Sequence, residues 1–312
     1  MLTALLLTLF VPAQYELHDL LPSYFTYRAT TSADPNAKTF MNTLVKPNRE
    51  VFEAVAFGWL QDDNPTRFLH LMEGNDAKFR HVENRFQNRF AIAWKRFKAN
   101  TPDANADVAV YLLPAPRNAV GGSVRPLKNT SAIIFGAEEL AGVIDSKEAF
   151  EVLVQHELTH LYHMQVNPEM RQMVKQVYMP PFSEGAAKLY QVMWLEGLAV
   201  YRSKLLNPRA SDLEIVLSGS VAQELQTQWP NVGVNLRKFL DSTKTADINK
   251  YLFDAPNTES IPRRTGYYVG MLIAKHLSTK YSFAEMCRLK GGTLRKEVGS
   301  SLDFLIKRGL HS

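Results

Sequence analysis

Residues 156–160 read His-Glu-Leu-Thr-His, and this spacing places two imidazoles one turn apart on one face of a helix. Asp145, followed three residues later by Glu148 and then by the mostly apolar stretch 149–154, predicts that a capped helix begins just upstream. Two imidazoles that project in the same direction suit tetrahedral zinc, and the Glu157 carboxylate lies beside them. The segment therefore predicts a helix, starting at Asp145, that carries part of a zinc site.

The flanks of this motif are apolar on nearly every side, so we expect the helix to be buried. Two histidines and a glutamate are costly in a buried helix unless an ion or hydrogen bonds compensate their polarity. We favour zinc, and the alternative is a buried histidine pair satisfied by hydrogen bonds.

His163 lies one turn further along the same helix. Three ligands on one straight helix cannot surround an ion, so we expect His163 to pack or to support a ligand.

A catalytic zinc needs a third protein ligand, and the sequence offers two glutamates for it. After a break at residues 180–183, a second helix is predicted from about Glu184 to Leu206. Glu184 stands in its first turn, where the helix dipole alone favours a carboxylate, whereas Glu196 interrupts a run that is apolar on almost all faces. A buried carboxylate is tolerated when it is paired or binds a cation, so Glu196 is the predicted ligand and Glu184 the fallback. Gly197 is expected to let this helix approach the motif helix closely.

The rest of the chain is predicted to be predominantly helical, with a short extended section before the motif helix. Strand signals cover three stretches, at residues 107–113, 121–124 and 131–135. A basic amphipathic helix is predicted over residues 80–98. These patterns indicate an α+β fold in which a small β-sheet lies next to the motif helix. A change of composition near residues 100–106 separates a helical N-terminal region, 14–104, from a domain that spans 105–312.

The composition is that of an ordinary globular protein of 312 residues, with 46% apolar and 21% charged side chains. The formal net charge of +5 is mild and spread along the chain, so no nucleic-acid partner is predicted.

Residues 2–10 are almost wholly apolar and run into Val-Pro-Ala-Gln at 11–14. This pattern predicts a signal peptide over residues 1–13, with export to a periplasm or out of the cell. The segment is too short for a stable membrane span, and its alternative is a buried N-terminal helix in a cytoplasmic protein.

Together with the motif, the segment Trp-Leu-Glu-Gly-Leu-Ala-Val-Tyr at 194–201 resembles the gluzincin arrangement of zinc metallopeptidases, in which a later helix supplies a glutamate ligand. More narrowly, with Gly-Tyr-Tyr-Val-Gly at 266–270, the chain is similar to predicted zinc-dependent proteases that carry an E-G-L-A-x-Y helix and a later G-Y-Y-x-G segment. The resemblance covers roughly residues 107–310. It implies a zincin-like metallopeptidase domain over 105–312, in which one catalytic Zn²⁺ is held by His156, His160 and Glu196.

The resemblance also implies a mechanism and the residues for it. Glu157 would act as general base on the water that zinc activates, for attack on the scissile carbonyl of a peptide or protein substrate. Tyr267 and Tyr268 are the candidates for stabilising the oxyanion, with packing as their plain alternative. The strand over 131–135 is expected to be an edge strand that holds the substrate backbone, or simply a strand that covers the motif helix. Val200 stands where the best-known members have an aspartate four residues after the zinc-binding glutamate.

Two further interpretations of the motif stay open. In one, the chain is a zinc-binding protein of the same fold that cleaves nothing. In the other, it is a metal-free helical binding module in which the motif is fortuitous. Bound zinc in the purified protein would exclude the second, and peptide cleavage would exclude the first. The sequence indicates neither the oligomeric state nor the cleavage specificity.

Overall fold

A β-sheet of four strands, in the order β1-β2-β4-β3, supports one side of the site described below. The computed structural model describes residues 15–30, 36–56, 64–105, 107–117, 121–128, 130–178, 185–253 and 261–310. Strands β1, β2 and β4 run parallel, and β3 is antiparallel to β4. The bounds of the strands are β1 Tyr15–Asp19, β2 Val108–Leu113, β3 Gly122–Pro126 and β4 Ser131–Gly136. The predicted signal peptide, residues 1–13, lies outside the described residues.

The three strands predicted from the sequence are confirmed as β2, β3 and β4. The inner strands β2 and β4 are buried along nearly their whole length, as expected for apolar strands covered on both faces. Strand β1 was not predicted. It pairs with β2 from Tyr15 opposite Val108 to Asp19 opposite Leu112, so a segment from the region predicted as helical forms one edge of the sheet.

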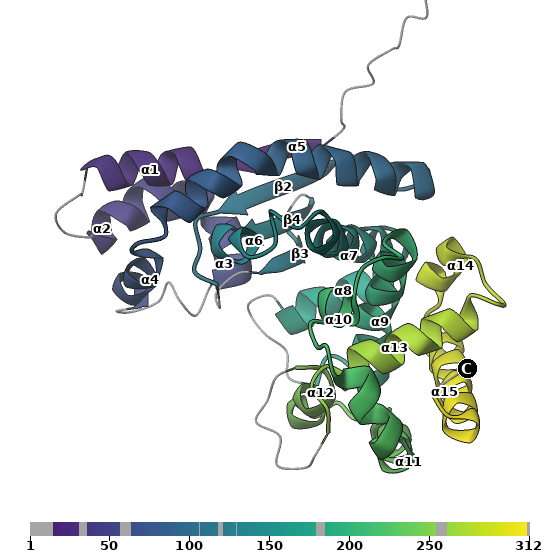
Figure 1. The fold of residues 1–312 in the computed structure, drawn as a ribbon. Helices are drawn as coiled ribbons and strands as arrows, with labels where there is room; N and C mark the ends of the chain where they lie inside the picture. The colour runs from purple at the N-terminus through teal and green to yellow at the C-terminus, as the bar shows by residue number, and fades with distance from the viewer. Residues whose placement is uncertain are drawn as a thin grey trace, which may run out of the picture.

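Helices α5, Asp76–Asn100, and α7, Lys147–Val166, pack against each other and against the sheet (Figure 1). The amphipathic helix predicted over residues 80–98 is confirmed within α5, and its apolar row is fully buried. The ring of Phe86 lies 5.5 Å from that of Phe135 on β4 and 6.1 Å from that of Phe150 on α7, measured between centroids. One aromatic row on α5 thus fixes the motif helix against the sheet.

The remaining described elements are helical, which confirms the predicted predominantly helical α+β class. Those between β1 and α5 are α1 Leu21–Thr30, α2 Ala37–Phe40, a π-helical turn Met41–Val45, a 3₁₀ turn Lys46–Asn48, α3 Arg49–Ala56 and α4 Asn64–Met72. Those that follow β4, apart from α7, are α6 Ala137–Ala141, α8 Pro168–Tyr178, α9 Leu189–Leu206, α10 Asp212–Val216, α11 Val221–Phe239, α12 Thr245–Leu252, α13 Thr265–Leu277, α14 Phe283–Arg288 and α15 Gly291–Arg308. Within the described ranges, every helix is too short or too polar to cross a membrane.

The start of the motif helix differs by one residue from the prediction. The N-cap of α7 is Ser146, whose hydroxyl accepts a hydrogen bond of 3.1 Å from the backbone N–H of Ala149. The Asp145 carboxylate, predicted to be the cap, instead accepts hydrogen bonds from His81 and Arg85 on α5. The side chains of His81 and Arg85 therefore engage the carboxylate, and the neighbouring hydroxyl caps the helix.

The second predicted helix, α9, begins at Leu189 and not near Glu184. Gly185 has a φ of +73°, in the left-handed region, which interrupts any helix at that point. Lys188 is extended, and its backbone N–H donates to the Gln191 side chain at 2.9 Å, so the first turn is capped there. The predicted end at Leu206 is confirmed.

Candidate metal centre

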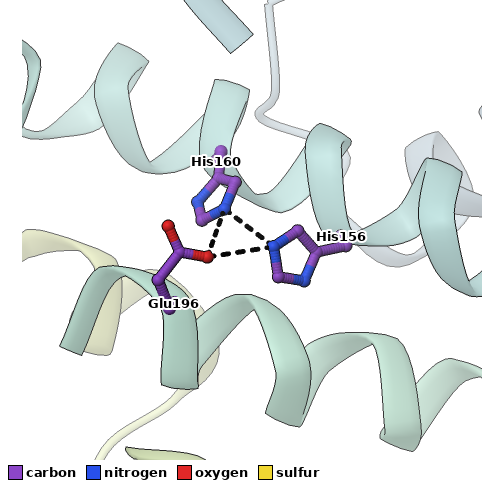
Figure 2. A group of neighbouring side chains, drawn as sticks. All are labelled: His156, His160 and Glu196. Atoms are coloured by element: carbon purple, nitrogen blue, oxygen red, sulfur yellow. Dashed lines mark hydrogen bonds and ion pairs between the residues drawn. The ribbon is translucent and has the colours of Figure 1, made fainter. Parts of the chain in front are cut away.

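His156 and His160 lie one turn apart on α7, which packs against α9. Their Nε2 atoms both face the Glu196 carboxylate on α9 (Figure 2). Oε2 of Glu196 lies 3.2 Å from Nε2 of His156 and 3.3 Å from Nε2 of His160, and the two ring nitrogens are 2.9 Å apart. The structure therefore brings together the three residues predicted as metal ligands. Glu184, the fallback, lies outside the described residues.

The donor set fits zinc. Two imidazole nitrogens and one carboxylate oxygen are common zinc donors, and tetrahedral ligands about 2.0 to 2.1 Å from zinc lie roughly 3.3 Å from one another. The donor separations of 2.9, 3.2 and 3.3 Å are near that value. Three protein donors leave one position of a tetrahedral ion for water or substrate. This group could therefore hold a metal ion with an open position.

The charges of the three residues are coupled because the site is buried. Burial raises the pKa of the Glu196 carboxyl, but the neighbouring His160 and His156 outweigh it and hold that pKa well below its usual range. Burial lowers the pKa of His160, and the Glu196 carboxylate outweighs it, so that pKa is raised. Glu196 thus remains ionised in the protein interior and requires a positive charge next to it, which a divalent ion would supply.

Glu157 lines the same pocket but does not belong to the group of three donors. Its side chain is buried, and burial raises the pKa of the carboxyl above its ordinary value. Strand β3 passes so close that a Cβ placed on Gly122 would lie 2.9 Å from Oε1 of Glu157. A glycine in a strand often marks such a close approach, so Gly122 is the signal in the sequence from which this contact could have been predicted. Gly122 leaves room for an acid or base beside the ligands.

The two candidate tyrosines on α13 have different surroundings. Tyr267 lines the pocket, its ring lies 6.4 Å from the His156 ring, and its hydroxyl is near enough to the Glu196 carboxylate to feel its charge. Burial, followed by the charge of Glu196, raises the pKa of Tyr267 well above its ordinary value. Tyr268 is not among the residues that line the pocket, and the acidic charge that raises its pKa, after burial, is Asp212 on α10. The structure therefore places Tyr267 in the site and Tyr268 outside it.

Two polar residues of the pocket were missed by sequence reasoning. Arg125 on β3 and Tyr178 at the end of α8 both line the pocket, and the guanidinium carbon lies 5.0 Å from the centroid of the Tyr178 ring. No motif joins these residues to the histidines in the sequence, because they come together only through the packing of β3 and α8.

The predicted edge strand is an inner strand. Residues 131–135 belong to β4, which is hydrogen-bonded to β2 on one side and to β3 on the other. The edge of the sheet beside the motif helix is β3, and residues 122–125 of that strand line the pocket. The expectation that residues 131–135 hold the substrate at a sheet edge is therefore wrong, because both sides of β4 are already paired.

Gly197 serves a different helix contact from the one predicted. A Cβ placed on Gly197 would lie 2.2 Å from the carbonyl carbon of Gly270 on α13, and its three nearest atoms all belong to Gly270. The close approach is therefore between α9 and α13. The Gly-Tyr-Tyr-Val-Gly segment of the sequence provides the other glycine of this contact.

His163 does not join the group of possible donors, so within the described ranges α7 contributes two residues to that group. Its ring is fully buried, and neither ring nitrogen has a hydrogen-bond partner among the described residues. Burial, followed by the charge on His160, lowers the pKa of His163 to about 3. His163 is thus a neutral residue that packs in the interior, one turn along α7 from the candidate ligand His160.

In comparisons with protein families, curated proteins and solved structures, no match to the chain is found, so the assignment of function rests on the geometry of this pocket.

Proposed function

We propose that the protein is a zinc-dependent peptidase with a zincin-like, gluzincin-type site, in which His156, His160 and Glu196 hold the ion. One observation carries the proposal: three donor atoms lie within 4.8 Å of one another while a fourth polar side chain, Glu157, lines the same pocket without joining them. Structural zinc sites are closed by four protein ligands. Three ligands with an adjacent carboxylate are typical of hydrolytic zinc sites.

When bound, zinc supplies Lewis-acid chemistry, lowering the pKa of water towards about 7 and polarising a carbonyl group. The Glu157 carboxylate accepts a proton from the attacking water as the new C–O bond forms. It then donates that proton to the nitrogen of the leaving amine as the C–N bond breaks, so the carboxylate returns to its starting charge. Burial favours this role, because the raised pKa of Glu157 makes its carboxylate a stronger base.

Two further roles belong to the proposal. Tyr267 keeps its proton at neutral pH, so it can donate a hydrogen bond to the carbonyl oxygen as that oxygen gains negative charge. Strand β3 is the proposed strand for the substrate backbone, because it lies at the edge of the sheet and lines the pocket.

The test is Glu157→Gln, with Glu148→Gln as its control. Gln keeps the size of the side chain but accepts no proton at neutral pH, so peptide hydrolysis should fall by about 10² to 10⁴ while zinc content stays near one per chain. Glu148 is an exposed residue in the first turn of the same helix, and its variant should keep both zinc and turnover. Activity is measured on a broad peptide library, and zinc by elemental analysis.

Two results would contradict the proposal. Wild-type protein that holds one zinc and cleaves no peptide would indicate a zinc-binding protein without proteolytic activity. A Glu157→Gln variant with undiminished turnover would show that hydrolysis takes another route.

A further inference from the structure

Arg125 projects from the edge strand β3 into the wall of the metal pocket, and its guanidinium is held in place by the backbone. Its Nε donates a hydrogen bond of 3.2 Å to the carbonyl oxygen of Ala54 on α3. Its Nη1 donates a hydrogen bond of 3.0 Å to the carbonyl oxygen of Val124. Nη2 has no hydrogen-bond partner within the described part of the chain. The guanidinium is therefore preorganised with donor capacity to spare.

No carboxylate forms an ion pair with Arg125 within the described ranges, although the residue is half-buried. Glu157 and Glu196 act on it only through their charges, without a hydrogen bond. Tyr178, under the guanidinium at 5.0 Å, has a buried hydroxyl that also has no hydrogen-bond partner among the described residues. The buried Tyr178 hydroxyl is costly unless a ligand satisfies it. Nη2 of Arg125, in the same pocket wall, is not a buried unpartnered atom, so it is accessible to such a ligand.

The charge balance of the pocket indicates what kind of ligand that is. With neutral histidines, the carboxylates of Glu157 and Glu196 and the guanidinium of Arg125 leave one net negative charge. A divalent ion on the three metal ligands changes this to one net positive charge. The loaded pocket would therefore favour an anion, and a guanidinium pairs best with a planar oxyanion such as a carboxylate.

We propose that Arg125, together with the Tyr178 hydroxyl, binds a carboxylate of the substrate and makes the enzyme selective for peptides that carry one close to the cleaved bond. This proposal rests on the proposed peptidase function. The carboxylate comes either from the C-terminus of the peptide or from an Asp or Glu side chain. A C-terminal source would make the enzyme a carboxypeptidase or a peptidase of short peptides.

Three matched peptides distinguish these sources: one with a free C-terminus, the same peptide with a C-terminal amide, and the amide with Glu next to the cleaved bond. Wild-type enzyme should cleave at least one carboxylate-bearing peptide with a kcat/KM about 10- to 100-fold above that of the plain amide. In Arg125→Gln this ratio should fall to near one, and in Arg125→Lys it should be partly restored. Lys175→Gln removes an exposed positive charge from α8 and should keep the wild-type ratio.

Binding tests the same point without catalysis. The zinc-loaded Glu157→Gln protein is titrated with the three peptides by calorimetry, alone and combined with Arg125→Gln or Arg125→Lys. The carboxylate peptide should bind about 10-fold or more tightly than the amide, and only when Arg125 is present. Tm values of the variants show that each is folded.

The two proposals fail in different ways. Equal binding and equal cleavage of all three peptides, or a carboxylate preference that persists in Arg125→Gln, would overturn the role of Arg125. An Arg125-dependent carboxylate preference in calorimetry, with no cleavage by wild-type enzyme, would keep carboxylate binding and overturn the peptidase function.

Discussion

Gly197 on α9 and Gly270 on α13 bring two helix backbones into direct contact. A Cβ on Gly197 would lie 2.2 Å from the carbonyl carbon of Gly270, and a Cβ on Gly270 would lie 2.3 Å from the carbonyl oxygen of Met193. Because the obstructing atoms are backbone, neither clash can be relieved by a change of rotamer. α9 carries Glu196 and α13 carries Tyr267, so this contact also sets the distance between the candidate ligand Glu196 and a tyrosine of the pocket.

Gly270→Ala should therefore lower the free energy of unfolding by about 3 kcal/mol or more, since overpacking against backbone forces the helices apart. Its control is Gly292→Ala on α15, where a Cβ meets nothing within 4 Å. The control should be neutral or stabilising by about 0.5 to 1 kcal/mol, because alanine is the better helix former. Urea denaturation of both variants measures the difference, and similar stabilities would contradict the close contact.

The third ligand is tested by comparing two glutamates. Glu196→Gln should reduce zinc from about one per chain to near zero, because an amide oxygen is a much weaker zinc donor than a carboxylate and the buried histidines lose their counter-charge. Glu184→Gln should keep its zinc. Elemental analysis after dialysis decides between them, and the reverse outcome would make Glu184 the ligand.

Adjacent tyrosines on α13 provide a second matched pair. Tyr267→Phe removes a pocket hydroxyl that interacts with the Glu196 carboxylate, so zinc affinity should fall by about 10- to 100-fold, the usual cost of losing a polar neighbour of a metal ligand. Tyr268→Phe, outside the pocket, should change the affinity less than about twofold. Competition with a chromophoric chelator measures both, and equal effects would show that the Tyr267 hydroxyl does not support the ligand.

His163 predicts a pH dependence of stability. Its pKa falls from 6.5 to about 3 on folding, so the unfolded chain binds a proton that the folded protein does not. The free energy of unfolding that this histidine contributes is complete above about pH 6.5 and is lost as the pH falls towards 3. Between pH 7 and pH 5, metal-free wild-type protein should lose about 1 to 2 kcal/mol more than His163→Leu. Equal losses in urea titrations would mean that His163 is not held neutral in the folded protein.

The features that could be predicted best from the sequence are those that depend on the spacing of residues within one helix or strand. The candidate ligands His156 and His160 could be predicted from their spacing of one helical turn, and Glu196 from its position as a single carboxylate in an otherwise apolar stretch of helix. The strands of residues 107–113 and 131–135 could be predicted because their apolar runs are continuous.

What the sequence did not predict depends on which distant elements pack together. The order of the strands decides that β3 and not β4 is the edge, and no pattern within residues 122–136 contains that order. Arg125 and Tyr178 meet only because β3 packs against α8, and Gly197 could be assigned a close contact but not its partner helix. Ser146 and not Asp145 caps α7, because the Asp145 carboxylate binds His81 and Arg85 on α5. That contact joins two helices far apart in the sequence, so local spacing could not predict it.

The pairing of β1 with β2 also has a consequence for the order of folding. Tyr15 lies opposite Val108, so the whole of α1 to α5 is synthesised between the two halves of one strand pair. Closing so long a loop costs conformational entropy that the short pairs β2–β4 and β3–β4 do not incur. We therefore expect the β3–β4 hairpin and α7 to assemble first and β1 to dock last, which would leave the two histidines of the site positioned before the sheet is complete.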